Sequence, residues 1–182
     1  MACRGVLFAL TPDDESGLLE LANPKQGFIA SLLGKRPSVD ECDRKVLEFL
    51  INDIEERWDK DWFCETDKAW DAIHRCLSDG SLNYRFDQPS HGAILGGVPL
   101  YSGDDYVISY KSAESVKRIA AAISLISDDD MGARYDALDE ERYGFPKDED
   151  DRAYTIEWFS GVREFYGKVA LAGRPVVFSV DQ

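Results

Sequence analysis

The amino-acid sequence predicts an α+β protein in which helices pack on a mixed β-sheet. Three short apolar segments typical of strands lie far apart in the chain, at residues 6–10, 106–110 and 175–180. Amphipathic helical patterns separate them, and the most regular of these spans residues 153–171. Strands interleaved with helices in this way indicate one sheet with helices packed on it, so we expect a single domain over residues 1–182.

The composition indicates a protein with a substantial apolar core and a strongly negative surface. The chain has 182 residues, of which 44% are hydrophobic, enough to form a core without disulfides or metals. Its formal net charge of −14 argues against binding to nucleic acid or to an anionic membrane, because both need clusters of Lys and Arg. The same charge permits a basic protein partner, although solubility alone accounts for many acidic proteins.

The cysteines and the apolar segments indicate a cytoplasmic protein without a cofactor. None of the cysteines, Cys3, Cys42, Cys64 and Cys76, lies at the short spacing of a zinc site or a redox motif. The first residues lack the pattern of a signal peptide, and no apolar run approaches the ~20 residues of a membrane span. We therefore expect reduced thiols, no bound metal and a cytoplasmic location.

Start and end signals predict two helices in the first third of the chain. Thr11 precedes Pro and three acidic residues, which is a helix start, and Asn23 with the following Pro ends that helix. A capping-box pattern at residues 38–41 begins a second helix. Residues 26–36 are ambiguous, and residues 57–65 are expected to cross the surface irregularly.

The stretch from Thr66 to Leu82 contains the densest set of unusual side chains. We predict a helix over residues 66–78, capped by Thr66 or Asp67 and followed by Gly80 in the left-handed conformation. Four residues at helical spacing form one apolar face that is expected to pack on the sheet: Trp70, Ile73, His74 and Leu77.

Loops and capped helices alternate in the second half. Residues 83–102 are rich in Gly and Pro and are interpreted as a loop. Ser112 is expected to cap a helix over residues 113–125, and a second capping pattern at Ser127 begins a shorter helix toward Leu138.

One motif resembles that of a known family. Asp67-Lys68-Ala69-Trp70, followed by Ile73-His74, is similar to the Asp-Lys-x-Trp-x-x-aliphatic-His signature of the bacterial YfbM-like proteins. The resemblance extends from the opening strand, through residues 93–100 and 110–116, to the C-terminal helix and strand, whereas residues 35–65 match no part of it. It implies an α+β single domain of unknown function and no particular substrate.

His74 has two interpretations. Asp71 and Asp67 lie three and seven residues before it, so a helix would bring a carboxylate toward the imidazole, as in acid–base sites. Alternatively, His74 is a core histidine, because it lies on the apolar face and no nucleophile is indicated nearby. The candidate pocket or family-motif residues are Asp67, Lys68, Trp70, His74 and His91.

Residues 128–151 are the most acidic part of the chain, with eleven Asp and Glu against three basic residues. Some of these acids cap helices, and the others are a hypothetical interaction face for a basic protein. The residues of this candidate interaction face are Asp139, Glu140, Glu141, Asp148, Glu149 and Asp150.

Two classes of function follow from these observations. The first is a non-enzymatic protein-interaction module, for example an immunity-type protein that blocks a basic partner. The second is a small-ligand-binding protein or an enzyme with a pocket around Asp67, Trp70 and His74. A convex acidic face with His74 buried would favour the first class, and a deep pocket lined by His74 would favour the second.

Overall fold

The computed structural model describes residues 3–22, 39–57, 59 and 61–181, and its centre is a five-stranded sheet in the order β2-β1-β5-β4-β3. Every strand pairing within these residues is antiparallel, so the α+β class is confirmed while the mixed pairing expected from the sequence is not found. The strands are β1 Gly5–Ala9, β2 Phe63–Asp67, β3 Val98–Ser102, β4 Tyr106–Lys111 and β5 Val176–Asp181.

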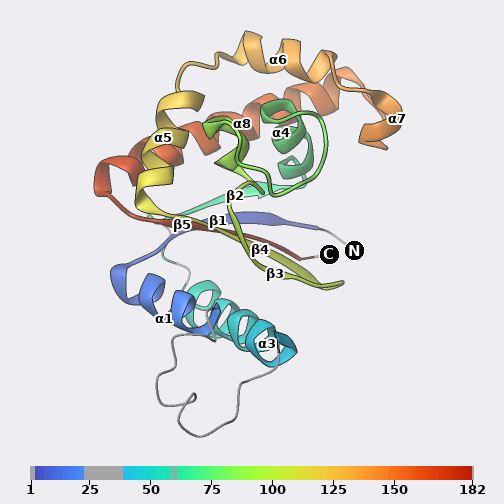
Figure 1. Ribbon diagram of the computed structural model, residues 1–182. Helices are drawn as coiled ribbons and strands as arrows, with labels where there is room; N and C mark the ends of the chain where they lie inside the picture. Colours follow the sequence, from blue (N-terminus) through green and yellow to red (C-terminus); the bar gives the residue numbers. More distant parts are fainter. Residues whose placement is uncertain (1–2, 23–38, 58, 60, 182) are drawn as a thin grey trace, which may run out of the picture.

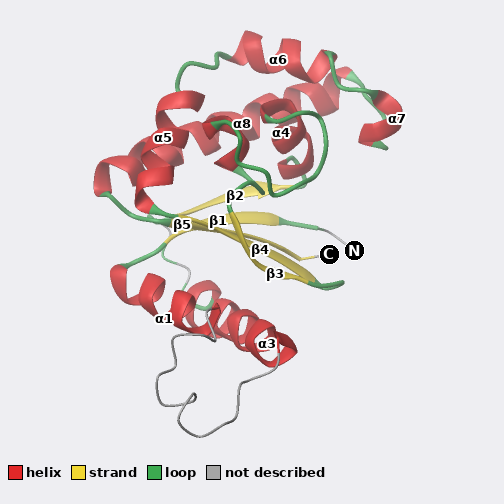
Figure 2. Cartoon of the chain, in the orientation of Figure 1, coloured by secondary structure: helices red, strands yellow, loops and turns green. Residues whose placement is uncertain are grey.

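Helices cover both faces of the sheet (Figures 1 and 2). One face carries α1 Pro12–Ala22, α3 Val39–Phe49 and the π-helix η1 Leu50–Glu55 that continues α3. The other carries α4 Trp70–Leu77, the 3₁₀ turn η2 Pro89–Ala93, α5 Ala113–Ile123, α6 Asp128–Asp136, α7 Glu140–Tyr143 and α8 Glu149–Ala172. None of the described helices is long and apolar enough to cross a membrane.

The sheet separates two apolar cores, because successive side chains of a strand point to opposite faces. In β1, Leu7 packs in the core under α4, α5 and α8, whereas Phe8 packs against α1 and α3. Phe178 and Val177 of β5 divide between the same two cores. Each helical layer therefore packs on its own face of the sheet and has its own apolar core.

The start of the central helix was wrongly predicted. Residues 63–67 form β2 instead of an irregular segment and a cap, and α4 begins only at Trp70, with Ala69 as an N-cap that makes no side-chain capping bond. The Thr66 hydroxyl donates to the Gly5 carbonyl at 2.8 Å, so the strand uses the side chain that was expected to cap the helix. Gly80 does adopt a positive φ of 83°, as predicted.

Other local signals had mixed outcomes. Ser112 caps α5 and Ser127 forms a capping box with Asp130, both as predicted. The expected loop at residues 83–102 ends in a strand, β3. The ambiguous segment 26–36 lies outside the described residues.

Candidate functional site

Asp67 connects three parts of the fold at the end of β2. Its backbone is left-handed, with φ of 42°, and turns the chain from the strand toward α4. One carboxylate oxygen accepts a hydrogen bond of 2.7 Å from the Tyr154 hydroxyl of α8, and the other lies 3.6 Å from Nε of Arg4. Asp67 therefore links β2, α8 and the segment before β1.

Trp70 is anchored against the sheet, with 8% of its surface exposed. Its indole nitrogen donates to the Cys3 carbonyl at 3.3 Å, and its ring centre lies 6.0 Å from that of Phe178. Gly5 permits this approach, since a Cβ there would lie 2.9 Å from Cβ of Trp70 and 2.6 Å from Oγ1 of Thr66. The burial expected for Trp70 is thus confirmed.

A groove of about 690 Å³ lies between α4, the segment joining α7 to α8, and the first turns of α8; we call it the α4–α8 groove. Phe145 and Leu82 lie in its lining with 57% and 41% of their surfaces exposed. Lys68, also exposed, adds a positive charge to the lining. Aromatic rings form much of the wall, from Trp70, Tyr143, Phe145 and Tyr154.

Carboxylates give the same groove a polar floor. Asp71 pairs with Arg75 at 2.5 Å, and the two side chains are only 15% and 11% exposed. Burial raises the pKa of Asp71, and the negative charge of Asp151 adds to that rise, although Arg75 acts against it. Asp151 accepts hydrogen bonds from the hydroxyls of Tyr135 and Tyr143.

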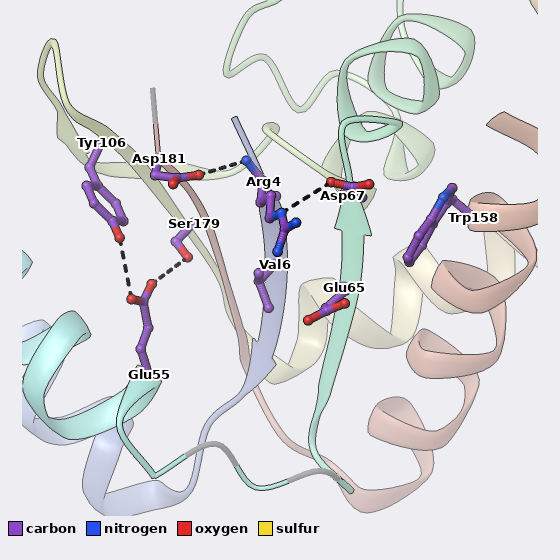
Figure 3. Close-up of a pocket in the computed structure, with 10 residues that line it drawn as sticks. Arg4, Val6, Glu55, Glu65, Asp67, Tyr106, Trp158, Ser179 and Asp181 are labelled. Carbon is purple, nitrogen blue, oxygen red and sulfur yellow. Dashed lines mark hydrogen bonds and ion pairs between the residues drawn. The ribbon is translucent and has the colours of Figure 1, made fainter. Parts of the chain in front are cut away.

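A second hollow of about 360 Å³, the sheet-end cavity, has Asp67 in its lining (Figure 3). Glu55 reaches into it, and its carboxylate accepts from Ser179 at 3.1 Å and, over a long 3.5 Å, from the Tyr106 hydroxyl. Burial raises the pKa of Glu55, and the hydrogen bonds from Ser179 and Tyr106 act in the opposite direction. Further lining residues are Arg4, Glu65, Asp181 and Trp158.

His74 lies inside the core and lines neither hollow. It is fully buried, and neither ring nitrogen has a hydrogen-bond partner among the described residues; the backbone of Asn83 is near but does not meet hydrogen-bond geometry. Burial lowers the pKa of His74 to about 4, with a further contribution from the positive charges of Lys111, His91 and Arg75. The structure therefore places His74 as a core histidine.

Lys111 is a second buried base on the same side of the sheet. Only 1% of its surface is exposed, and its amine donates to the Ile94 carbonyl and, at 2.6 Å, to the Ser109 hydroxyl. No carboxylate pairs with it among the described residues, and burial lowers its pKa well below the usual range. His91, half-buried in η2, also lies away from both hollows.

The acidic segment forms α6, α7 and the start of α8, and the fold uses more of its carboxylates than the sequence suggested. Asp139 caps α7 and Asp148 caps α8, each accepting from a backbone N–H three residues later. Asp128 and Asp136 pair with arginines of α8 at 2.9 Å. Four members of the candidate interaction face are exposed and are not N-caps: Glu140, Glu141, Glu149 and Asp150.

The described thiols and potential metal ligands show no reactive arrangement. Cys3, Cys64 and Cys76 are free, and burial raises the pKa of both Cys64 and Cys76 to about 12. Within the described ranges, no group of three or more His, Cys, Asp and Glu could hold a metal ion. The side chain of Cys42 lies outside the described residues.

Comparisons with known proteins place the chain in a family. The model of a domain of unknown function, DUF1877, matches residues 1–179. The chain belongs to the DUF1877 family. Its fold is similar to the crystal structure of YfbM, a protein of unknown function from Escherichia coli, with a TM-score of 0.60, 14% identity and coverage of 97% of this chain and 99% of that one. No curated protein matches the sequence.

The resemblance of the DUF1877 chain to the YfbM-like proteins is thereby confirmed. At 14% identity the structural likeness concerns the fold alone. The structure brings Asp67, Lys68 and Trp70 to the two hollows but keeps His74 and His91 apart from them. The sequence did not predict that residues near α7 and the start of α8 would line the groove. The one local signal for them is a pair of aromatic residues, Tyr143 and Phe145, within an acidic stretch.

Proposed function

We propose that this protein is a cytoplasmic, non-enzymatic protein-interaction module that binds a basic protein partner at the α4–α8 groove and the acidic surface beside it. The observation that carries the proposal is the exposure of Phe145 and Leu82 in a groove with aromatic walls. Exposed apolar side chains gathered in one groove are typical of binding sites, and aromatic residues contribute most binding energy at interfaces.

The charge distribution supports a basic partner. Glu149 and Asp150 follow the groove residue Asp148 directly, and Glu140 and Glu141 lie in α7, shortly before Tyr143 of the groove wall. Surface carboxylates of this kind attract a positively charged protein, which increases the association rate at low salt.

An immunity-type role is the concrete form of this proposal. An acidic protein can block the active site of a basic toxin by covering it, and this needs no catalytic group of its own. The buried position of His74 supports this class, because an acid–base residue must reach its substrate.

The test compares two matched variants. The face variant carries Glu140→Gln, Glu141→Gln, Glu149→Gln and Asp150→Asn, and leaves the caps Asp139 and Asp148 in place. The control variant removes the same charge from exposed positions elsewhere, with Glu20→Gln, Asp53→Asn, Glu56→Gln and Asp104→Asn. Affinity capture from the source cell at low salt supplies the partner, and stopped-flow association with the purified partner supplies the rate.

We expect wild type and control variant to capture the same basic protein, and the face variant to associate with it at least tenfold more slowly, with a flatter salt dependence. Equal association rates for the face and control variants, or capture of no basic protein by wild type, would overturn the proposal.

A second candidate is a small-ligand-binding protein or an enzyme that uses the sheet-end cavity. One observation favours it: Glu55, whose pKa burial raises, shares this cavity with Asp67 of the family motif. A partly buried carboxyl of this kind is suited to proton transfer. A thermal-shift screen of small metabolites would support this function if a stabilising compound loses its effect in Glu55→Gln.

A further inference from the structure

The floor of the α4–α8 groove offers two carboxylate oxygens that have no hydrogen-bond donor. Asp71 uses Oδ1 for Arg75, and Asp151 uses Oδ2 for both Tyr135 and Tyr143. Oδ2 of Asp71 and Oδ1 of Asp151 accept no hydrogen bond from the part of the chain that the structure describes. Both residues line the groove and are only partly exposed. These oxygens are therefore available to a donor that enters the groove.

We infer that the groove receives one arginine side chain of the basic partner, with its guanidinium bridging Asp71 and Asp151. This inference rests on the proposed function and names the chemistry of its anchor. The lining still favours a cation, because its carboxylates outnumber its one amine, Lys68. Arg75 pairs with Asp71, whereas Asp151 is paired only with neutral hydroxyls. Asp71 and Asp151 line the same groove, and the negative charge of Asp151 adds to the rise that burial causes in the pKa of Asp71.

The walls favour a guanidinium over an ammonium group. A guanidinium is planar, stacks on aromatic faces and has five N–H donors that can serve two carboxylates at once, whereas an ammonium is a compact point charge. Trp70, Tyr143 and Tyr154 supply aromatic rings to the lining of the groove. The same protein already uses this type of contact, since the guanidinium of Arg174 lies 3.7 Å from the ring centre of Trp62.

The mouth of the groove indicates the neighbours of that arginine. Phe145 and Leu82 expose apolar surface there, and Pro146 follows Phe145 in the lining. Apolar residues on either side of the arginine would cover this surface and exclude water from the ion pair, as residues around an interface anchor do. The expected ligand is therefore an arginine within an apolar segment of the partner.

The test uses three fluorescein-labelled pentapeptides, Ala-Leu-X-Phe-Ala, blocked at the C-terminus, in which X is arginine, lysine or citrulline. Citrulline keeps the shape of arginine and removes its charge. Fluorescence anisotropy with the full chain should give a Kd below about 1 mM for the arginine peptide. We expect at least fivefold weaker binding of the lysine peptide and at least twentyfold weaker binding of the citrulline peptide.

Variants locate the site. Asp71→Asn and Asp151→Asn should each weaken binding of the arginine peptide at least tenfold, while Asp136→Asn, which removes a carboxylate paired with Arg152 outside the groove, should not. Phe145→Ser changes a side chain that is 57% exposed and should weaken binding at least threefold without affecting the fold. Circular dichroism identifies any variant that does not fold, and Phe145→Ser then decides the outcome.

Equal affinities for the arginine and citrulline peptides would show that the groove takes any apolar segment and would overturn the inference. Unchanged binding in Asp71→Asn, Asp151→Asn and Phe145→Ser would overturn it as well. If the arginine peptide does not bind while the face variant still slows association with the captured partner, the arginine anchor is wrong and the proposed function stands. If neither experiment gives its expected result, the proposed function fails with it.

Discussion

The Tyr154 hydroxyl donates a hydrogen bond of 2.7 Å to the carboxylate of Asp67. This contact joins the end of β2 to α8 and lies where the α4–α8 groove meets the sheet-end cavity. Tyr154 lines the former and Asp67 lines the latter. The Tyr154 ring also packs edge-on against Trp158 of the cavity, with ring centres 5.9 Å apart. The hydrogen bond between Tyr154 and Asp67 thus lies between the two hollows.

Replacing Tyr154 by Phe should lower the free energy of unfolding by about 1 kcal/mol, because it removes a hydrogen bond to a partly exposed charged group. Urea denaturation measures the loss. Tyr84→Phe is the matched control, since the Tyr84 hydroxyl makes no hydrogen bond with the described residues and its loss should change stability by less than about 0.5 kcal/mol. Equal effects of the two changes would contradict the role of the Asp67 contact.

Trp70→Ala should lower the free energy of unfolding by ~3–5 kcal/mol, since it removes a large buried ring that packs on Phe178. Chemical denaturation of both proteins gives the value. Trp70→Phe keeps part of the ring contact and should lose less. A loss under about 1 kcal/mol for the alanine variant would show that Trp70 does not organise this part of the fold.

The pH dependence of stability should carry a contribution from His74. Its pKa is about 4 in the folded protein against 6.5 for a free imidazole, so the unfolded state binds the proton more readily. Stability that is present above pH 6.5 is therefore lost as the pH falls from about 6.5 to about 4, by about 3 kcal/mol in total. Denaturant titrations at several pH values should show a shallower slope for His74→Gln over this range; parallel curves would contradict the expectation.

The N-cap of α8 can be tested by mutation, and the same experiment checks whether the face variant should fold. Asp148→Ala should lower the free energy of unfolding by about 1 kcal/mol, because the backbone N–H of Asp151 loses its acceptor. Asp150→Ala removes the same charge from the same helical turn without removing a cap and should cost only about 0.3 kcal/mol. Thermal and urea unfolding distinguish the two. If Asp150→Ala were as damaging as Asp148→Ala, the face variant could not be assumed to fold.

The sequence was most informative where a local pattern determines the structure. Capping at Ser112 and Ser127 was predictable, because the residues that make these bonds lie within one turn of each other. β2 was not predictable in this way. Its side chains alternate between the two faces, but Glu65 and Asp67 make it polar, and a Thr-Asp pair before an apolar stripe is also a typical helix start.

The residues of the candidate site also differ in whether the sequence alone could identify them. Asp67, Lys68 and Trp70 are contiguous in sequence, so a motif could identify them together. Tyr143 and Tyr154 line the groove because the tertiary fold places α7 and α8 near α4. Tertiary contacts of this kind leave no periodic pattern in the sequence. His74 was correctly assigned to an apolar helical face, and its burial follows from that face meeting the sheet.

The left-handed backbone of Asp67 limits which residues this position can accept during evolution. A side chain at φ of 42° is strained unless it is Gly, Asn or Asp, so β-branched and bulky residues are disfavoured whatever their chemistry. The contact with Tyr154 adds a second requirement, a short side chain with an acceptor oxygen, which Gly does not meet. Relatives that keep both the turn and the tyrosine should therefore vary only between Asp and Asn here, which makes this position a sharper marker of shared architecture than the apolar residues around it.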